Sequence, residues 1–173
     1  MRKLVLIIMI LASAVLVYPY AESSFFRTAD YRFENDPNEQ KIYKVEGMID
    51  KASDLKKPLR YEIAKAMVTF GDKYRVKYEH LISIAKVESN MNPFAINRES
   101  GDYGLLQINW EANGKKYVKK PAELLDVNKN VEVACKIIRK NLDAGFTVAH
   151  FHSFDPERRD DYQQKLRLVL NRF

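Results

Sequence analysis

Glu88 has the setting in this sequence that is best suited to acid–base chemistry. It shares one face of a helix, predicted to run from Tyr78 to Ser89, with apolar residues at the i, i+3, i+4, i+7 spacing: Leu81, Ile84 and Ala85. Glu88 therefore lies at the carboxyl end of that helix, where the helix dipole disfavours a further negative charge. The dipole and the apolar neighbours both favour the protonated carboxyl group, which can give its proton to the leaving-group oxygen of a breaking bond.

Two motifs lie at and after the end of this helix: Glu-Ser-Asn-Met-Asn-Pro at residues 88–93 and Gly-Asp-Tyr-Gly-Leu-Leu-Gln-Ile-Asn at residues 101–109. Together they resemble the paired signature of the soluble lytic transglycosylase (SLT) family, in which Glu-Ser, Asn-Pro and Gly-Leu-Met-Gln-Ile occur in this order. The resemblance implies that Glu88 acts as the only catalytic acid and base. It also implies a peptidoglycan substrate, cleavage between N-acetylmuramic acid and N-acetylglucosamine, a 1,6-anhydro product and no cofactor.

Five further residues are candidates for substrate binding. Gln107 offers an amide to sugar hydroxyls and acetamides, and Asn109 ends the second motif. Ser89 can contact the sugar or can support the turn after Glu88 by bonding to the backbone. Phe151 and His152 stand where many family members carry Tyr-Asn, so His152 is a candidate sugar contact, whereas Phe151 lacks the hydroxyl group of the family's tyrosine. This variant is similar to small transglycosylases that open the wall for secretion machines.

Asp102 raises an alternative, because residues 88–90, 97–98 and 102–109 are also similar to the C-type lysozymes. In that alignment Asp102 takes the position of the second carboxylate, which acts as a nucleophile or stabilises the charged sugar. The shorter spacing from Glu88 and the lack of a disulfide framework favour the transglycosylase, with Asp102 as a turn or capping residue. Cys135 is the single cysteine, and its apolar neighbours predict that it is buried.

The net charge of +6 and the pI near 9.3 favour an anionic partner such as cell wall, lipid head groups or nucleic acid. No nucleic-acid motif is present, so nucleic acid is not expected. His150 and His152 flank Phe151, but no Cys, Asp or Glu at ligand spacing completes a metal site, and no metal is expected. A catalytically silent wall-binding or assembly protein is a further alternative, which the intact Glu88 disfavours.

The chain divides into three expected parts. Residues 1–21 have a basic start, an apolar run and a small residue at Ala21, which predicts a cleaved export signal or an uncleaved N-terminal membrane anchor. Residues 22–57 are expected to be a linker or N-terminal extension. Residues 58–173 are expected to form the lysozyme-like catalytic domain, in the periplasm or cell envelope, where a secretion or envelope-spanning machine is a candidate partner.

The fold class expected for this domain is mainly α, of the α+β lysozyme-like type, with a short extended segment lining a cleft. Hydrophobic periodicity predicts helices at residues 42–52, 78–89, 131–144 and 157–172, and another from Pro58 that ends near Gly71. Residues 102–110 are expected to be extended or turn-like, with Gly101 and Gly104 giving backbone freedom.

Overall fold

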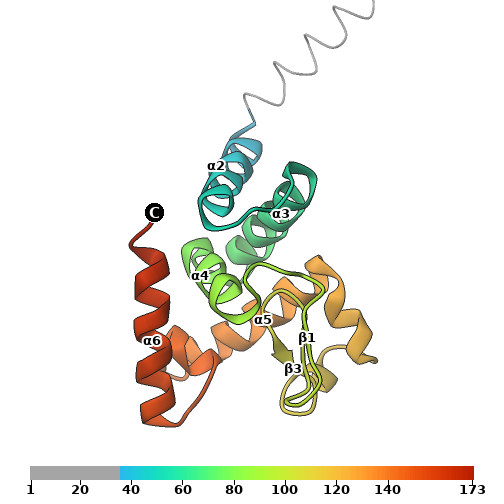
Figure 1. Cartoon of the computed structure of the whole chain (residues 1–173), viewed down its shortest axis with the longest axis vertical. Coiled ribbons are helices and arrows are strands. Elements are labelled where there is room, and N and C mark those ends of the chain that lie inside the picture. Colours follow the sequence, from blue (N-terminus) through green and yellow to red (C-terminus); the bar gives the residue numbers. More distant parts are fainter. Residues whose placement is uncertain (1–35) are drawn as a thin grey trace, which may run out of the picture. The chain divides into compact units, whose positions relative to one another are not determined.

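The computed structural model describes residues 36–173, so the predicted signal or anchor at residues 1–21 and residues 22–35 of the predicted extension lie outside the described residues. The main compact unit runs from Lys41 to Phe173. It is mainly helical with one small sheet, which confirms the expected fold class (Figure 1). Within the described range, no helix is both long and apolar enough to cross a membrane.

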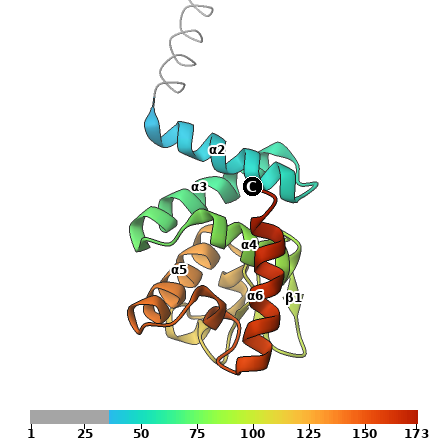
Figure 2. The ribbon, with the colours of Figure 1, turned by 90° about the vertical axis from the view of Figure 1, so that its left-hand side faces the viewer.

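The helical part of the described chain consists of five α-helices: α2 (Pro37–Ala52), α3 (Lys57–Tyr74), α4 (Tyr78–Ser89), α5 (Val127–Asp143) and α6 (Pro156–Leu170). Three short 3-10 helices connect them, namely η1 (Gly114–Lys116), η2 (Pro121–Leu125) and η3 (Val148–Phe151). Helix α5 packs against α3, and α6 packs against α4. Figure 2, a quarter turn from Figure 1, shows α6 standing in front of α4 with α5 to one side.

The sheet lies between α4 and η1 in the sequence and contains three two-residue strands: β1 (Ile96–Asn97), β2 (Asp102–Tyr103) and β3 (Ile108–Asn109). They are antiparallel in the order β1-β2-β3, with Ile96 opposite Tyr103 and Asp102 opposite Asn109. The predicted extended segment is thus the centre and one edge of the sheet. Figure 1 shows the sheet on the opposite side of the molecule from α6.

Helix α4 contributes a fully buried face to the core. Its predicted stripe of Leu81, Ile84 and Ala85 is fully buried, and the helix begins and ends at the predicted residues. Burying a leucine or isoleucine side chain contributes about 1.5–3 kcal/mol to stability. This burial fixes the orientation of α4, and therefore the direction in which Glu88, on the same face, projects.

Two expectations about the first half of the chain differ from the structure. Helix α3 does not end near Gly71 but continues to Tyr74. The next residue, Arg75, has the left-handed backbone conformation that ends the helix. The reason for glycine is space, because a Cβ atom at Gly71 would lie 2.9 Å from the carbonyl oxygen of Val76. The compact unit also begins at Lys41 and not at residue 58, since α2 buries an apolar face in the same core: Ile42, Val45, Ile49 and Ala52.

Candidate active site

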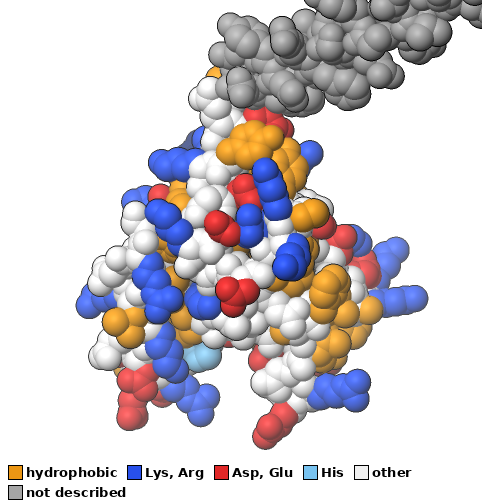
Figure 3. Space-filling view, turned by 45° about the horizontal axis from the view of Figure 1, so that its top comes forward, with side chains coloured by type: hydrophobic (Ala, Val, Ile, Leu, Met, Phe, Trp, Pro, Cys, Tyr) orange, Lys and Arg blue, Asp and Glu red, His pale blue; other side chains and the backbone are white. Residues whose placement is uncertain are grey.

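A polar cavity of about 300 Å³ opens between the sheet and the helical side of the molecule. Figure 3 shows a hollow between two lobes, with a histidine side chain at its edge. Six residues singled out from the sequence line this cavity: Glu88, Asp102, Gln107, Asn109, Phe151 and His152. The remaining lining comes from Ile108, Ala112, Asn113 and Ile137. Segments that are far apart in the sequence therefore meet at Glu88.

The Glu88 carboxyl group is mostly withdrawn from solvent, with 15% of its side chain exposed. Helix α4 stops one residue later, because Asn90 and Met91 both have positive φ angles and the Met91 N–H donates to the carbonyl oxygen of Ala85. Met91 itself is fully buried, which anchors this turn. Glu88 is thus held on the last turn of a rigid helix and faces the cavity.

His152, the residue after η3, is a polar partner of Glu88. Its Nδ1 atom lies 3.3 Å from the Glu88 Oε1 atom, and its side chain is 42% exposed. The two groups form an ion pair when the imidazole carries a proton. His152 therefore lies close enough to place a positive charge beside the Glu88 carboxylate at the edge of the cavity.

Tyr162 of α6 completes this arrangement and was missed as a site residue in the sequence. Its ring stacks on His152, with centroids 4.4 Å apart and planes 9° from parallel. The phenol is buried, and its hydroxyl group forms no hydrogen bond of good geometry with any described residue. Burial, and then the neighbouring Glu88 carboxyl group, raise the pKa of Tyr162, so the hydroxyl keeps its proton and remains a donor beside Glu88. In the sequence, its spacing with Leu166 and Val169 is typical of a core residue.

Asp102 lies in β2 and shares the cavity with Glu88. Its two oxygens are both bonded: Ser100 Oγ donates to Oδ2 over 2.5 Å, and Asn109 Nδ2 donates to Oδ1 over 2.9 Å. Asn109 also donates to the Ser100 carbonyl and accepts from the Ala112 N–H. Asn109, predicted to bind substrate, therefore uses its amide to hold Asp102 and the following turn, while the carboxylate of Asp102 is fixed in direction.

Gln107 keeps one side-chain atom free for substrate, whereas the Ser89 side chain bonds to the backbone. The Gln107 Nε2 atom donates to the carbonyl oxygens of Ala95 and Gly104, so only its Oε1 atom is left to accept from a sugar. Ser89 does not line the cavity. Its hydroxyl group donates to the carbonyl oxygens of Leu105, over 2.7 Å, and Ala85, which ties the end of α4 to the loop before β3 and is the supporting role weighed for Ser89 against sugar contact.

Asn130 is a buried support of the same loop that sequence reasoning did not single out. Its Oδ1 atom accepts from the Leu106 N–H, and its Nδ2 atom donates to the carbonyl oxygens of Tyr103 and Leu124. The backbone comes so close at Gly104 that a Cβ atom there would lie 2.3 Å from Asn130 Nδ2. Asn130 thereby locks the segment between β2 and β3, which carries Gln107, onto α5.

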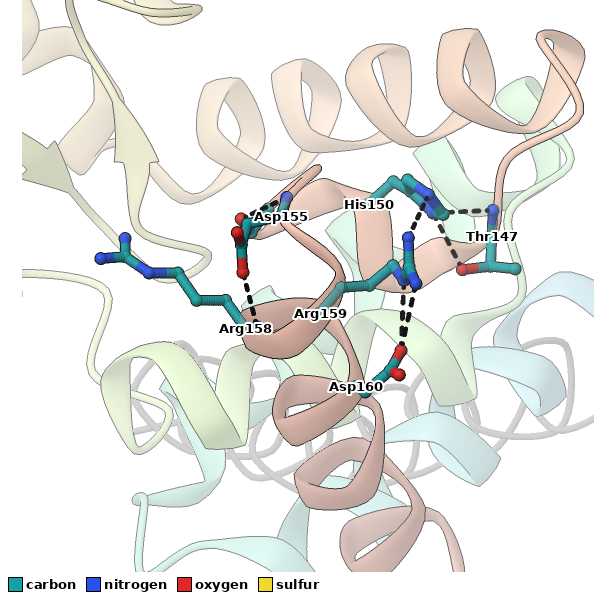
Figure 4. Close-up of polar contacts among 7 residues, drawn as sticks. Thr147, His150, Asp155, Arg158, Arg159 and Asp160 are labelled. Carbon is teal, nitrogen blue, oxygen red and sulfur yellow. Dashed lines mark hydrogen bonds and ion pairs between the residues drawn. The ribbon is translucent and has the colours of Figure 1, made fainter.

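His150 does not line the cavity and takes part in a network of polar contacts with Thr147 and Arg159 (Figure 4). The Thr147 N–H donates to its Nδ1 atom, and Arg159, paired with Asp160, lies against its other nitrogen. Asp155 caps the start of α6 by accepting from a backbone N–H. These contacts fix η3 on α6 and so position the adjacent His152. In the described part of the chain, no group of three or more His, Cys, Asp or Glu side chains could hold a metal ion.

Residues 66–148 match the family model described as the transglycosylase SLT domain. The match confirms the resemblance drawn from the two motifs and includes Glu88, Asp102 and Gln107. It ends before Phe151 and His152, which line the cavity, and before Tyr162, which stacks on His152. No curated protein and no solved structure matches the chain.

Proposed function

Because the chain carries a transglycosylase SLT domain at residues 66–148, we propose that it is a peptidoglycan lytic transglycosylase with Glu88 as its catalytic acid and base. It cleaves the β-1,4 bond between N-acetylmuramic acid and N-acetylglucosamine and leaves a 1,6-anhydro end. The observation that carries the proposal is the Glu88 carboxyl group, nearly buried and paired with His152, in a cavity lined by polar side chains.

In the first step the protonated Glu88 gives its proton to the glycosidic oxygen as the bond to C1 of the muramyl sugar breaks. The oxygen leaves as the 4-hydroxyl group of N-acetylglucosamine, and the acetamide of the muramyl sugar stabilises the positive charge at C1. The oxygen of Gln107 is free to accept from a sugar N–H or hydroxyl group and so to orient the ring.

In the second step the Glu88 carboxylate takes the proton of the muramyl 6-hydroxyl group while its oxygen bonds to C1. This closes the 1,6-anhydro ring and restores the protonated acid, so no water molecule is consumed. The stacked pair of Tyr162 and His152 offers two N–H or O–H donors that can stabilise the Glu88 carboxylate between the steps.

A lysozyme-type hydrolase is the second candidate, because Asp102 lines the same cavity as Glu88. In that reaction Asp102 attacks C1 or stabilises its charge, and water completes the cleavage. We favour the transglycosylase because both oxygens of Asp102 already accept hydrogen bonds from Ser100 and Asn109, which suits a residue that fixes the β2–β3 connection.

The test is the release of soluble fragments from purified peptidoglycan by wild type and by Glu88→Gln. The amide keeps the size of the side chain but has no proton to donate, so turnover should fall by at least about 10³-fold, an order typical for loss of a catalytic acid. Glu62→Gln, at an exposed position on α3, is the matched control and should keep full activity. Activity of Glu88→Gln above a few percent of wild type would refute the assignment.

The substrate also sets a location for the proposed activity, since peptidoglycan lies outside the cytoplasmic membrane. The proposal therefore includes export by residues 1–21, which act as a cleaved signal or as an anchor. It also includes an envelope-spanning machine as the partner that uses the opening made in the peptidoglycan. Fusion of residues 1–40 to a reporter that is active only outside the cytoplasm tests the export, and an inactive fusion would contradict it.

A further inference from the structure

A second groove of about 390 Å³ lies between α5 and the segment that follows η1. We call it the α5 groove and define it by six of its lining residues: Tyr117, Val118, Lys119, Glu132, Val133 and Lys136. None of them lines the cavity around Glu88.

The α5 groove lies about one helical turn along α5 from the catalytic cavity. Ile137 of α5 and Asn113 line the cavity, whereas Val133 and Tyr117, each four residues away, line the groove. Four residues of an α-helix rise about 6 Å. A four-residue peptide spans up to roughly 13 Å when extended. A peptide attached to a sugar in the cavity is therefore long enough to reach the groove.

The charges of the groove leave one cation available to a ligand. Glu132 accepts from the ammonium groups of Lys136 and Lys73 and from the Tyr74 hydroxyl group, so its charge is already matched. Lys119 is exposed, and its ammonium group contacts no carboxylate among residues 36–173. A ligand carboxylate can pair with Lys119 without displacing an internal partner.

Glu123 and Lys129 also line the groove and form a matched ion pair, and the rest of its surface is apolar or aromatic. Val118 and Val133 give it aliphatic walls, and Tyr117 exposes 37% of its surface. The Lys136 ammonium group lies 5.8 Å from the centroid of the Tyr117 ring, which holds the ring in place through a cation–π contact. The combination suits a short peptide with small apolar side chains and free carboxylates.

We propose that the α5 groove binds the peptide substituent of the muramyl sugar while the glycan strand lies in the catalytic cavity. That substituent has alanine methyl groups for the apolar walls and carboxylates for Lys119. The proposal rests on the proposed function for its substrate, but its binding step does not depend on cleavage. It makes the enzyme selective for strands that still carry their peptides.

The binding test uses the full chain and a free peptide, L-Ala-γ-D-Glu-diaminopimelate-D-Ala, in an NMR titration. Shifts are expected for backbone amides of the groove, such as Val118 and Val133. Lys119→Ala should raise Kd about three- to fivefold, the range of an exposed ion pair. The control is Lys120→Ala, since Lys120 is exposed on the same segment but does not line the groove, and its Kd should equal that of wild type.

The kinetic test compares peptide-bearing glycan strands with strands stripped of peptide by an amidase. For Lys119→Glu we expect KM on peptide-bearing strands to rise about tenfold with kcat unchanged, and no change on stripped strands. Equal effects on both substrates, or equal effects of the Lys119 and Lys120 variants, would mean that these lysines attract anions without a specific peptide site. Either result would overturn the proposal. Wild type that cleaves neither strand but binds the peptide would refute the proposed function alone. Cleavage of both strands without peptide binding would refute the groove alone.

Discussion

Gly104→Ala is expected to be strongly destabilising, because two atoms occupy the space that an alanine methyl group needs. A Cβ atom at this position would lie 2.1 Å from the Leu124 carbonyl oxygen and 2.3 Å from Asn130 Nδ2. The φ angle of +80° adds about 1–2 kcal/mol of strain for any residue with a Cβ atom. Moving Asn130 away disturbs its three hydrogen bonds, each worth about 1 kcal/mol net.

Together these costs predict that the free energy of unfolding falls by about 4–5 kcal/mol, a large part of the roughly 5–15 kcal/mol typical of a domain. Gly145→Ala is the matched control. Gly145 has nearly the same φ angle, +83°, but nothing lies within 4 Å of its Cβ position, so only the strain of about 1–2 kcal/mol should be lost.

Urea denaturation of both variants, followed by circular dichroism, measures the two losses separately. Asn130→Ala combined with Gly104→Ala should cost less than the sum of the single changes, because one of the two close contacts no longer exists in the double variant. If Gly104→Ala and Gly145→Ala lose the same stability, the close approach of Asn130 does not shape this wall of the cavity, and the reasoning is refuted.

Three further outcomes are expected. Tyr162→Phe should lower kcat about tenfold, as the loss of one hydrogen-bond donor predicts. Its thermal stability should equal or exceed that of wild type, because a buried hydroxyl group without a partner is removed. An unchanged kcat would contradict the role of Tyr162 beside Glu88. Asp102→Asn should lose less than about tenfold in turnover, whereas a loss of about 10³-fold or more with the fold intact would favour the hydrolase. Burial raises the pKa of the Cys135 thiol to about 12, so a maleimide at pH 8 should label the protein only in denaturant, and rapid labelling of the native protein would contradict this burial.

Much of the catalytic helix could be predicted from the sequence, because its signals are local. The apolar stripe of α4 repeats within two turns, so it predicts both ends of the helix and the face on which Glu88 lies. The prediction that Gly71 ends α3 was wrong for a non-local reason. The glycine there makes room for the backbone of the following turn inside a helix that continues to Tyr74.

The supports of the site could not be predicted in the same way, since they act between distant segments. Asn130 bonds to backbone groups 24 and 27 residues before it, and no local pattern distinguishes it from a solvated asparagine near the start of a helix. Tyr162 has the spacing of a core residue in α6, and only the packing of α6 against α4 brings its ring onto His152 beside Glu88. Ser89 was ambiguous because a hydroxyl group next to a catalytic residue can face either the ligand or the backbone.

The masses of the new glycan ends test the central claim most directly. Purified strands are digested with the wild-type protein, and the muramyl ends are analysed by mass spectrometry before and after borohydride reduction. Cleavage by Glu88 alone, with the 6-hydroxyl group as nucleophile, predicts ends that are lighter than a hydrolysed end by one water molecule and that borohydride leaves unchanged. Ends that contain the added water and gain two hydrogens on reduction would contradict the account and identify a hydrolase.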